Sequence, residues 1–490
     1  MNPTLVFSIV FAFFQTNDRW MGFRGDGTSV TSAMGLPVRW SPSDGIAWKA
    51  AIPGYGQSNP LIWKNHVYVT SVDGQNKEMG LVTALDLQGG RVLWQKPFAT
   101  SQKMKQGPMT SRAAPTGTVD DERVVALFET GDLLAIDHAG NELWKRSLTE
   151  ELGKWDNNHG MASSLAQDAV NVFVLADHRG SNPWLMAINK ATGRTTWKVD
   201  RKPVSSWTSP VYDKLDGQPT VLVSSSGSLD AYSALDGKLL WHLEGFTGNT
   251  IPSPVVAGDR VILGAGENRM KPDLAASAKS NGAVRIEKGQ PKLDWGTQKV
   301  ILQHASPIVH KGIVYFTTKA GMIHAHDLID GKELFTQRLS DPCWATPIAA
   351  GNNIYFFGKN GLTTVIESGP LGKRLAINRI WDEEEHQKRK IADEKKPENQ
   401  IKPGESKKVE HEKKKQPEST PGKTLQANDR EVKKSNTNQT QNNPPAMPPD
   451  RARSMGNEAV GDVVYGIAAV DGQWLIRTGT ELICIRHGAK

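Results

Sequence analysis

Eight polar or aromatic residues recur at similar places along the chain, and their types suit ligand recognition. Each stands beside or just before a short phrase of small residues that opens a repeated unit. Trp207 and Trp344 offer flat faces for stacking on a sugar, a peptide or an aromatic ligand. Arg112 offers a guanidinium for a carboxylate or a phosphate. The full set is Gln57, Arg112, His159, Trp207, Asn249, His304, Trp344 and Tyr465.

Metal and nucleophile chemistry has weaker support in the sequence. His324 and His326 alternate along an apolar segment, so both would point to one face of a strand. Two histidines without a third ligand are a poor metal site, and we expect them to pack between repeats. The polar segment 156–160 offers oxygens, but a loop before a strand accounts for it. Phosphate-loop, nucleophile-elbow and His-Glu-x-x-His motifs are missing, so no catalytic residue and no metal ligand is predicted.

The elements that position these residues are repeats. One phrase runs from Ala through an apolar residue and Asp, Asn or Ser to a Gly and then to an aromatic residue, as in Ala84, Gly90 and Trp94. The Asp or Asn opens a turn and the Gly supplies a positive φ, so each phrase predicts a β-hairpin. The Trp is expected to pack between neighbouring sheets with its N–H on a partner. The aromatic residues are Trp48, Trp94, Trp144, Trp197, Trp241, Trp295 and Phe335.

A second phrase, of small residues usually followed by Pro, opens each unit. It occurs eight times, near positions 58, 113, 162, 208, 252, 305, 345 and 466. Successive aromatic residues are 40 to 54 positions apart, which leaves room for four strands per unit. Such a period predicts an all-β, eight-bladed propeller of four-stranded antiparallel blades. The eight candidate binding residues would then ring the mouth of its central channel.

The ends of the chain predict how the ring closes. The last unit stops after its third strand, near Ile485. Residues 45–49 form a Trp strand with no partners before it, so we expect this strand to complete the last blade. That join would remove two exposed sheet edges. Residues 17–381 are thus assigned to blades 1–7 plus the closing strand, and residues 456–490 to the last blade.

Residues 382–455 interrupt the repeats. They hold 17 Lys or Arg and 14 Asp or Glu but no Phe, Trp or Tyr, so we expect a disordered charged insertion. The formal charge of the whole chain is +7, yet no basic helix or patterned basic sheet appears, and nucleic-acid binding is not predicted. The two cysteines, Cys343 and Cys484, imply no disulfide framework.

The N-terminus predicts export. Leu5 to Phe14 is an apolar run of ten residues, too short to span a bilayer as a helix. It resembles the core of a secretory signal, although no Lys or Arg precedes it. Residues 1–16 are therefore assigned as a signal peptide, and the protein is expected in the periplasm or outside the cell, with no transmembrane span.

The repeats resemble those of bacterial propellers related to pyrroloquinoline quinone (PQQ) dehydrogenases. That superfamily also includes the non-catalytic, eight-bladed propeller of outer-membrane barrel assembly. The segment Trp20-Met21-Gly22-Phe23-Arg24-Gly25-Asp26-Gly27 is similar to a leader found on exported bacterial members of the group. The resemblance covers about residues 20–380 and 458–490 and supports the propeller fold.

The resemblance also implies what an enzyme of this group needs. Its dehydrogenases usually hold PQQ against a disulfide of two adjacent cysteines and bind Ca²⁺ through Glu and Asn near a catalytic Asp. Here Cys343 and Cys484 are 141 positions apart, and no local cluster offers the six to eight oxygens of a Ca²⁺ site. We therefore predict no cofactor.

The sequence thus predicts an exported, non-catalytic propeller that acts as a binding or protein-interaction scaffold. Its expected partner is a protein or a glycan, and the chain is expected to be a monomer. Two alternatives stay open, a PQQ-dependent oxidoreductase and a carbohydrate-binding module.

Overall fold

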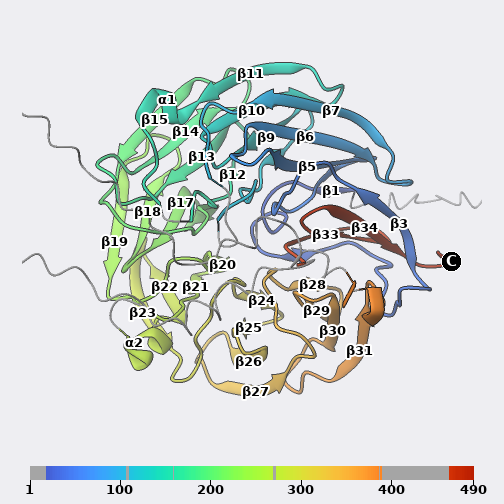
Figure 1. Cartoon of the computed structure of the whole chain (residues 1–490). Helices are drawn as coiled ribbons and strands as arrows, with labels where there is room; N and C mark the ends of the chain where they lie inside the picture. The colour runs from blue at the N-terminus through green and yellow to red at the C-terminus, as the bar shows by residue number, and fades with distance from the viewer. Residues whose placement is uncertain are drawn as a thin grey trace, which may run out of the picture.

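Eight antiparallel sheets surround one axis and confirm the eight-bladed, all-β propeller (Figure 1). The computed structural model describes residues 18–105, 110–157, 159–268, 272–385, 387–388 and 463–489. The signal-like residues 1–16 and nearly all of the charged insertion lie outside this part of the chain, so both assignments stay predictions. No helix among the described residues is long and apolar enough to cross a bilayer.

Each blade contributes one short strand to the channel wall. The small residues that precede these strands let eight of them approach the axis. The inner strands are β4 (Leu61–Trp63), β8 (Thr118–Val119), β12 (Ala166–Gln167), β16 (Val211–Leu215), β20 (Val255–Ala257), β24 (Ile308–His310), β28 (Ile348–Ala350) and β32 (Gly466–Val470).

The middle strands of each blade carry the core. Most of their residues are buried on both faces, as expected where each sheet is covered by two neighbours. The second strands are β5 (His66–Asp73), β9 (Arg123–Leu127), β13 (Asn171–Ala176), β17 (Gln218–Ser225), β21 (Arg260–Leu263), β25 (Ile313–Thr317), β29 (Asn353–Phe357) and β33 (Gln473–Arg477). The third strands are β6 (Met79–Asp86), β10 (Asp132–Asp137), β14 (Trp184–Asn189), β18 (Ser228–Ser233), β22 (Gly282–Glu287), β26 (Met322–Asp327), β30 (Leu362–Glu367) and β34 (Glu481–Arg486).

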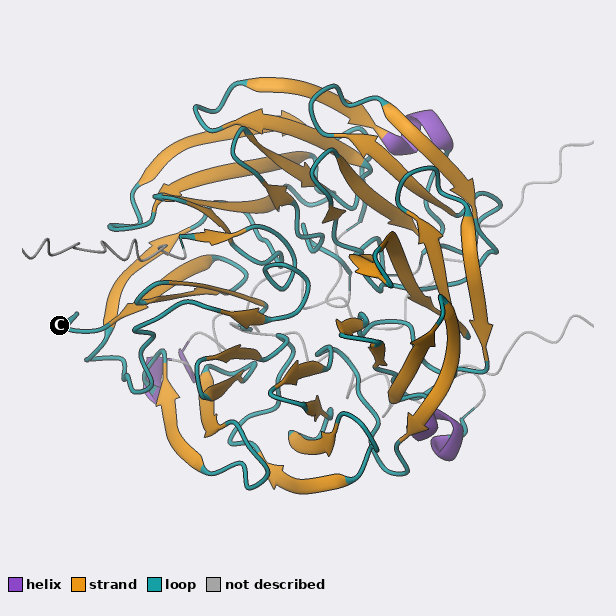
Figure 2. Cartoon of the chain, turned by 180° about the vertical axis from the view of Figure 1, so that it is seen from behind, coloured by secondary structure: helices purple, strands orange, loops and turns teal. Residues whose placement is uncertain are grey.

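The outer strands face solvent along one edge, and all of them except β31 carry one of the repeated aromatic residues. They are β7 (Val92–Ala99), β11 (Glu142–Ser147), β15 (Thr195–Asp200), β19 (Leu239–Glu244), β23 (Gln290–Gly296), β27 (Glu333–Arg338), β31 (Arg374–Arg379) and β3 (Ile46–Ala51). Helices α1 (Leu148–Leu152) and α2 (Leu274–Lys279) lie at the outside of the ring (Figure 2).

The repeated Trp and Gly meet at the junctions between blades. Trp144 of one blade donates its Nε1–H to the carbonyl of Lys190, 2.8 Å away in the hairpin turn of the next blade. In the same turn Gly193 has φ +69°, and a Cβ there would lie 2.7 Å from the Trp144 ring. Trp48, Trp94, Trp197 and Trp295 make equivalent bonds to the following blade. The expected interblade packing of Trp is confirmed, and the Gly serves both the turn and the close approach of the ring.

The ring closes as the sequence predicts. Strand β3 pairs antiparallel with β34, and the register joins Lys49 to Ile483 and Ala51 to Glu481. The last blade is therefore built from β32, β33, β34 and the N-terminal β3, which lie together at one side of the ring (Figure 1). The pairing covers the edge of β34 that the last unit would otherwise expose.

The segment before β3, residues 18–40, crosses the end of the channel, and we call it the leader. Its strands β1 (Arg19–Trp20) and β2 (Val30–Thr31) join β4 in blade 1 and β28 in blade 7. Between them, the Arg24 guanidinium donates to the carbonyl of Pro254 in blade 5, 2.7 Å away. Strands β1 and β2 pair with residues of the inner strands β4 and β28 themselves, not with the residues that precede those strands. The leader therefore lies at the end of the channel where the inner strands end, opposite the end where they begin.

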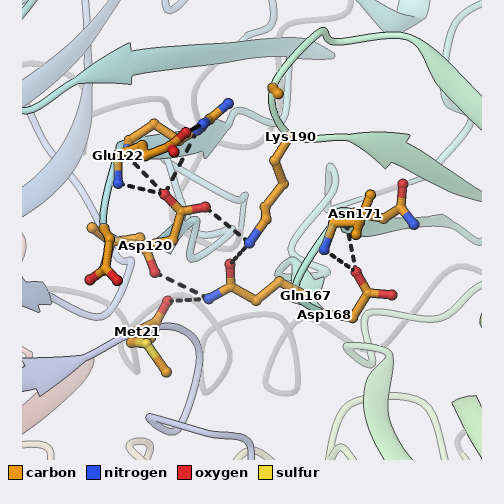
Figure 3. Close-up of polar contacts among 12 residues, drawn as sticks. Met21, Asp120, Glu122, Gln167, Asp168, Asn171 and Lys190 are labelled. Carbon is orange, nitrogen blue, oxygen red and sulfur yellow. Dashed lines mark hydrogen bonds and ion pairs between the residues drawn. The ribbon is translucent and has the colours of Figure 1, made fainter.

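Side chains of blades 2 and 3 hold the leader in place. The amide of Gln167 donates to the carbonyl oxygens of Met21 and Val119, 3.3 and 3.2 Å away (Figure 3). Lys190 donates to the other end of the same amide and pairs with Asp120 at 2.9 Å. This chain of contacts fixes the leader against two blades at once.

A binding cup in the propeller channel

The channel contains a cavity of about 1150 Å³ that we call the cup. Its mouth lies where the inner strands begin, and Phe23 of the leader contributes to its lining. Since the leader crosses the other end of the channel, we describe the space as a cup with a floor rather than an open tunnel. Six of the eight predicted binding residues line it, namely Gln57, His159, Trp207, His304, Trp344 and Tyr465.

Aromatic side chains form an arc along one side of the mouth. The ring centroids of His304 and Trp344 are 4.8 Å apart, and those of Trp344 and Tyr465 are 6.0 Å apart. The Tyr465 hydroxyl shares a hydrogen bond of 2.8 Å with that of Tyr55. The Nζ of Lys359 lies 5.4 Å from the Trp344 ring centroid. The arc joins blades 6, 7, 8 and 1 and offers a half-exposed aromatic wall.

A second aromatic pair faces the cup from blades 3 and 4. The ring centroids of His159 and Trp207 are 5.5 Å apart. The Trp207 indole N–H donates to the carbonyl of Gly160 at 3.0 Å, which fixes the orientation of the ring. With its N–H used by the protein, Trp207 has its ring face left for contact with an occupant.

The structure does not bring Arg112 and Asn249 into the cup lining. The Arg112 guanidinium lies 3.5 Å from the ring centroid of Tyr55, and its backbone N–H donates to the side chain of Gln57 at 2.9 Å. Asn249 is fully buried, where its amide donates to Ser224, Ser225 and Ser228 and accepts from the N–H of Gly227. Arg112 thus contacts the neighbouring residues Tyr55 and Gln57, and Asn249 holds the turn around Gly227.

Six hydroxyl groups, one from each of blades 2–7, line the cup in an arc that was not anticipated from the sequence, and we call them the hydroxyl ring. In six successive blades the backbone N–H of an opening residue donates to the side-chain oxygen of its counterpart in the next blade, at 2.9 to 3.1 Å. The ring runs through Asn59, Thr116, Ser164, Ser209, Ser253, Ser306 and Thr346, all of which line the cup.

The hydrogen bonds of the hydroxyl ring all run the same way, from the backbone N–H of one blade to the hydroxyl of the next. Each hydroxyl oxygen accepts one backbone hydrogen and keeps its own O–H as a donor. The small Ser and Thr of the opening phrases therefore serve two purposes, close packing and hydrogen bonding between blades. The sequence signal was the recurrence of Ser or Thr in the opening phrases, directly before Pro in four of the six cases.

Charged side chains near the mouth are mostly basic. Arg179, Lys299 and Lys319 line the cup, and Glu267 is the one carboxylate among its described lining residues. Arg179 donates to the hydroxyl of Ser205 at 2.8 Å. Together with the O–H donors of the hydroxyl ring, these cations make the cup more suited to an acidic occupant than to a basic one.

The residues of the cup do not fit PQQ and its calcium ion. Cys343 and Cys484 are both buried, unpaired thiols in separate hydrophobic clusters, so they cannot form a disulfide over a quinone. Burial raises the pKa of both thiols, to about 12 for Cys484. No Asp occurs among the described lining residues to act beside Glu267 and Asn268. The arrangement implied by the family's dehydrogenases is not found in the described part of the cup.

Comparison with solved structures supports the fold. The structure of BamB from Moraxella catarrhalis covers 90% of this chain and 99% of its own, with a TM-score of 0.54 and 11% identity. The quinohemoprotein alcohol dehydrogenase of Comamonas testosteroni covers 75% of this chain and 74% of its own, with a TM-score of 0.52 and 13% identity. At these identities the likeness concerns the fold alone.

Curated relatives point the same way. The outer membrane protein assembly factor BamB of Burkholderia pseudomallei (strain K96243) is 25% identical over 249 residues, which are 50% of this chain and 59% of the relative. The BamB of Alkalilimnicola ehrlichii is 26% identical over 230 residues, 44% of this chain and 50% of the relative. The chain spans about half the length of the curated relatives it matches.

A family model described as outer membrane protein assembly factor BamB matches this chain in three overlapping stretches. They are residues 17–155, 78–337 and 181–391. Together they include the leader and the first seven blades. The overlaps are expected of a repeated fold, since one set of blades can align with another. By this match, the chain belongs to the BamB family of PQQ-like propellers.

Proposed function

We propose that this protein is an exported, non-catalytic interaction scaffold, and that its cup holds an extended, acidic segment of a protein partner. One observation carries the proposal: a cup closed by the leader is lined by aromatic faces, a ring of hydroxyl donors and more cations than carboxylates. The names of the relatives, which are assembly factors, support a role in protein interaction.

The shape of the cup favours a segment over a folded surface. A cavity of about 1150 Å³ is near the upper end of ordinary ligand sites, and it accepts a loop or a chain end of several residues. The floor prevents such a segment from passing through the ring. An extended segment would stack an aromatic or apolar side chain on Trp344 or Trp207 and place its carboxylates toward Lys299 and Lys319.

Export is part of the proposal and rests on the sequence of residues 1–16 and on the relatives. Its test is fractionation of cells that express the full chain, followed by N-terminal sequencing of the mature protein. Recovery of the intact N-terminus in the cytoplasm would contradict export without bearing on the cup.

Photo-crosslinking from the cup wall tests the binding role. A benzoylphenylalanine placed at Trp344 is expected to form an adduct with a specific protein in living cells. The same residue placed at Trp63, near the far end of inner strand β4, is the matched control and is expected to form none. Equal labelling from both positions, or none from Trp344, would count against a partner in the cup.

The chemistry of the occupant is tested with synthetic peptides. A peptide with one Trp and several Asp or Glu residues is expected to bind the purified protein more tightly than its Lys-substituted analogue, and the difference should shrink with added salt. Replacing Lys299 with Glu should reduce the preference. A glycan array on the same protein addresses the carbohydrate alternative, since sugar binding without peptide binding would replace the proposal with that one.

A further inference from the structure

The sixth blade holds a cluster of three potential metal ligands outside the contacts discussed so far. His324 and His326 stand at alternate positions of β26 and so share one face of the sheet. Glu333 begins the neighbouring strand β27, and the register places it directly opposite His326. One ligand atom from each of the three residues lies within 4.8 Å of the other two.

A β-bulge brings the third ligand to the pair. The register between β26 and β27 shifts between Ala325 and His326, at the place where the two strands leave their turn. As a result the Glu333 carboxylate reaches back along the histidine face. Its Oε2 lies 3.2 Å from Nδ1 of His324 and 4.0 Å from Nε2 of His326.

His326 is held with one nitrogen turned toward this cluster. Its Nδ1 lies 2.9 Å from the carbonyl oxygen of Gly331. A carbonyl only accepts, so Nδ1 carries the proton and Nε2 presents a lone pair. That Nε2 is buried and has no hydrogen-bond partner within the described structure. A backbone carbonyl that fixes the tautomer of a histidine is the usual support for a metal-binding imidazole.

Packing further restricts the His326 ring. It stacks on Trp295 of the preceding blade, with centroids 6.1 Å apart and planes at 16°, and meets Phe316 edge-on at 5.7 Å. The expected packing of this histidine between blades is thus present. Nδ1 of His326 has a hydrogen-bond partner, but Nε2 is buried without one in the described structure. Packing between the blades does not account for a buried nitrogen that has no partner.

We propose that His324, His326 and Glu333 form a binding site for a divalent transition-metal ion of the zinc class. Two imidazole nitrogens and one carboxylate oxygen match the three-ligand sets of Zn²⁺ sites that keep a fourth position open. With metal–ligand bonds of about 2.1 Å, tetrahedral ligand atoms are about 3.4 Å apart. The Glu333 Oε2 lies 3.2 Å from Nδ1 of His324 and 4.0 Å from Nε2 of His326, and the ligand atoms all lie within 4.8 Å of one another, so binding requires the three side chains to adjust. It also requires the hydrogen bond between His324 and Glu333 to give way to the metal.

The site is reachable from the channel. His324 is among the residues that line the cup, together with Met322 and Thr318 of the same blade. His324 thus connects the cluster to the cup, and Glu333 of the outer strand is exposed to solvent. The metal-site inference does not depend on the identity of the partner in the cup.

The test uses the full chain without an affinity tag, stripped with EDTA and titrated with ZnCl₂ by calorimetry. We expect saturable binding of one equivalent, and Co²⁺ is expected to give the visible absorption of a four-coordinate site with nitrogen and oxygen ligands. Glu333→Gln and His326→Gln are each expected to weaken binding at least tenfold. Glu333→Gln alters a half-exposed side chain and should leave the circular dichroism spectrum unchanged.

His310→Gln is the matched control. His310 belongs to the same blade, but its Nε2 bonds to the carbonyl of Gly351 and it is outside the cluster. This variant is expected to bind zinc as the parent protein does. Failure of the parent protein to bind one equivalent, or equal loss in Glu333→Gln and His310→Gln, would overturn the proposal.

Discussion

The contact between Trp144 and Gly193 predicts how strongly one glycine supports a blade junction. Replacing Gly193 with Ala has two costs. First, Ala would adopt φ +69°, a left-handed conformation that costs about 1–2 kcal/mol for a residue with a Cβ. Second, the new Cβ would lie 2.7 Å from Cδ2 of Trp144, far inside the usual carbon–carbon contact of about 3.5–4.0 Å.

Relief of that overlap requires movement of the indole. Overpacking typically costs about 1–3 kcal/mol, and loss of the 2.8 Å bond from Trp144 to Lys190 adds about 1 kcal/mol. We therefore expect Gly193→Ala to lower the free energy of unfolding by about 3–6 kcal/mol in all. The assay is urea-induced unfolding followed by far-ultraviolet circular dichroism.

A matched glycine separates the two costs. Gly289 occupies the hairpin turn of the fifth blade with φ +72°, but a Cβ there meets nothing within 4 Å. Gly289→Ala should thus lose only the conformational part, about 1–2 kcal/mol. In a Trp144→Ala background the cost of Gly193→Ala should fall to the same value, and the resulting coupling energy should be about 2–4 kcal/mol. Equal losses in the two glycine variants, or coupling below about 0.5 kcal/mol, would refute the reasoning.

Three further predictions concern polar contacts, two of them buried and one near the surface. Ser209→Ala should destabilise the protein by about 1–3 kcal/mol in the same unfolding assay, because the buried N–H of Ser164 loses its acceptor at 3.0 Å, whereas Ser209→Thr should cost much less. Arg201→Met should cost about 3–5 kcal/mol, since it leaves the buried carboxylates of Asp177 and Asp230 without the cation that now lies 2.7 and 3.0 Å away; loss below 1 kcal/mol would contradict this. Hydrogen bonds to Glu244 and then to Asp230 raise the pKa of His242 above its usual 6.5, so its stabilising effect should be full below about pH 6.5 and fade as the pH rises through the folded-state pKa. If the loss of stability in a His242→Gln variant grew with rising pH, the raised pKa of His242 would be contradicted.

The sequence predicted those parts of the fold that depend on neighbours along the chain. Asp137 accepts hydrogen bonds from Ala139 and Asn141 within its own turn, as the repeated phrase indicates. The hairpin, its Gly and the following Trp therefore follow from about ten residues. The missing fourth strand of the last unit also predicted the pairing of β3 with β34, because an unpaired edge needs a partner.

Contacts between blades were harder to predict. The hydroxyl of Ser209 serves a residue 45 positions away, and nothing local distinguishes it from any other Ser before a Pro. The two histidines of β26 were visible in the sequence, but Glu333 joins them only because a bulge shifts the register of β27. Six of the predicted mouth residues line the cup, while Asn249 is buried because its amide satisfies the backbone of a neighbouring turn.

The pairing of β3 with β34 has a consequence for biosynthesis. Ile46 is made about 440 residues before Ile485, yet they are partners in one sheet. At ribosomal rates of about 5–20 residues per second, the first strand waits roughly 20–90 s for the strand that it must meet. During that interval blades 1–7 can assemble, but β3 has no partner strand and the ring stays open between blade 7 and blade 1. A nascent chain released before β34 is made therefore lacks the strand that β3 needs as its partner in the last blade.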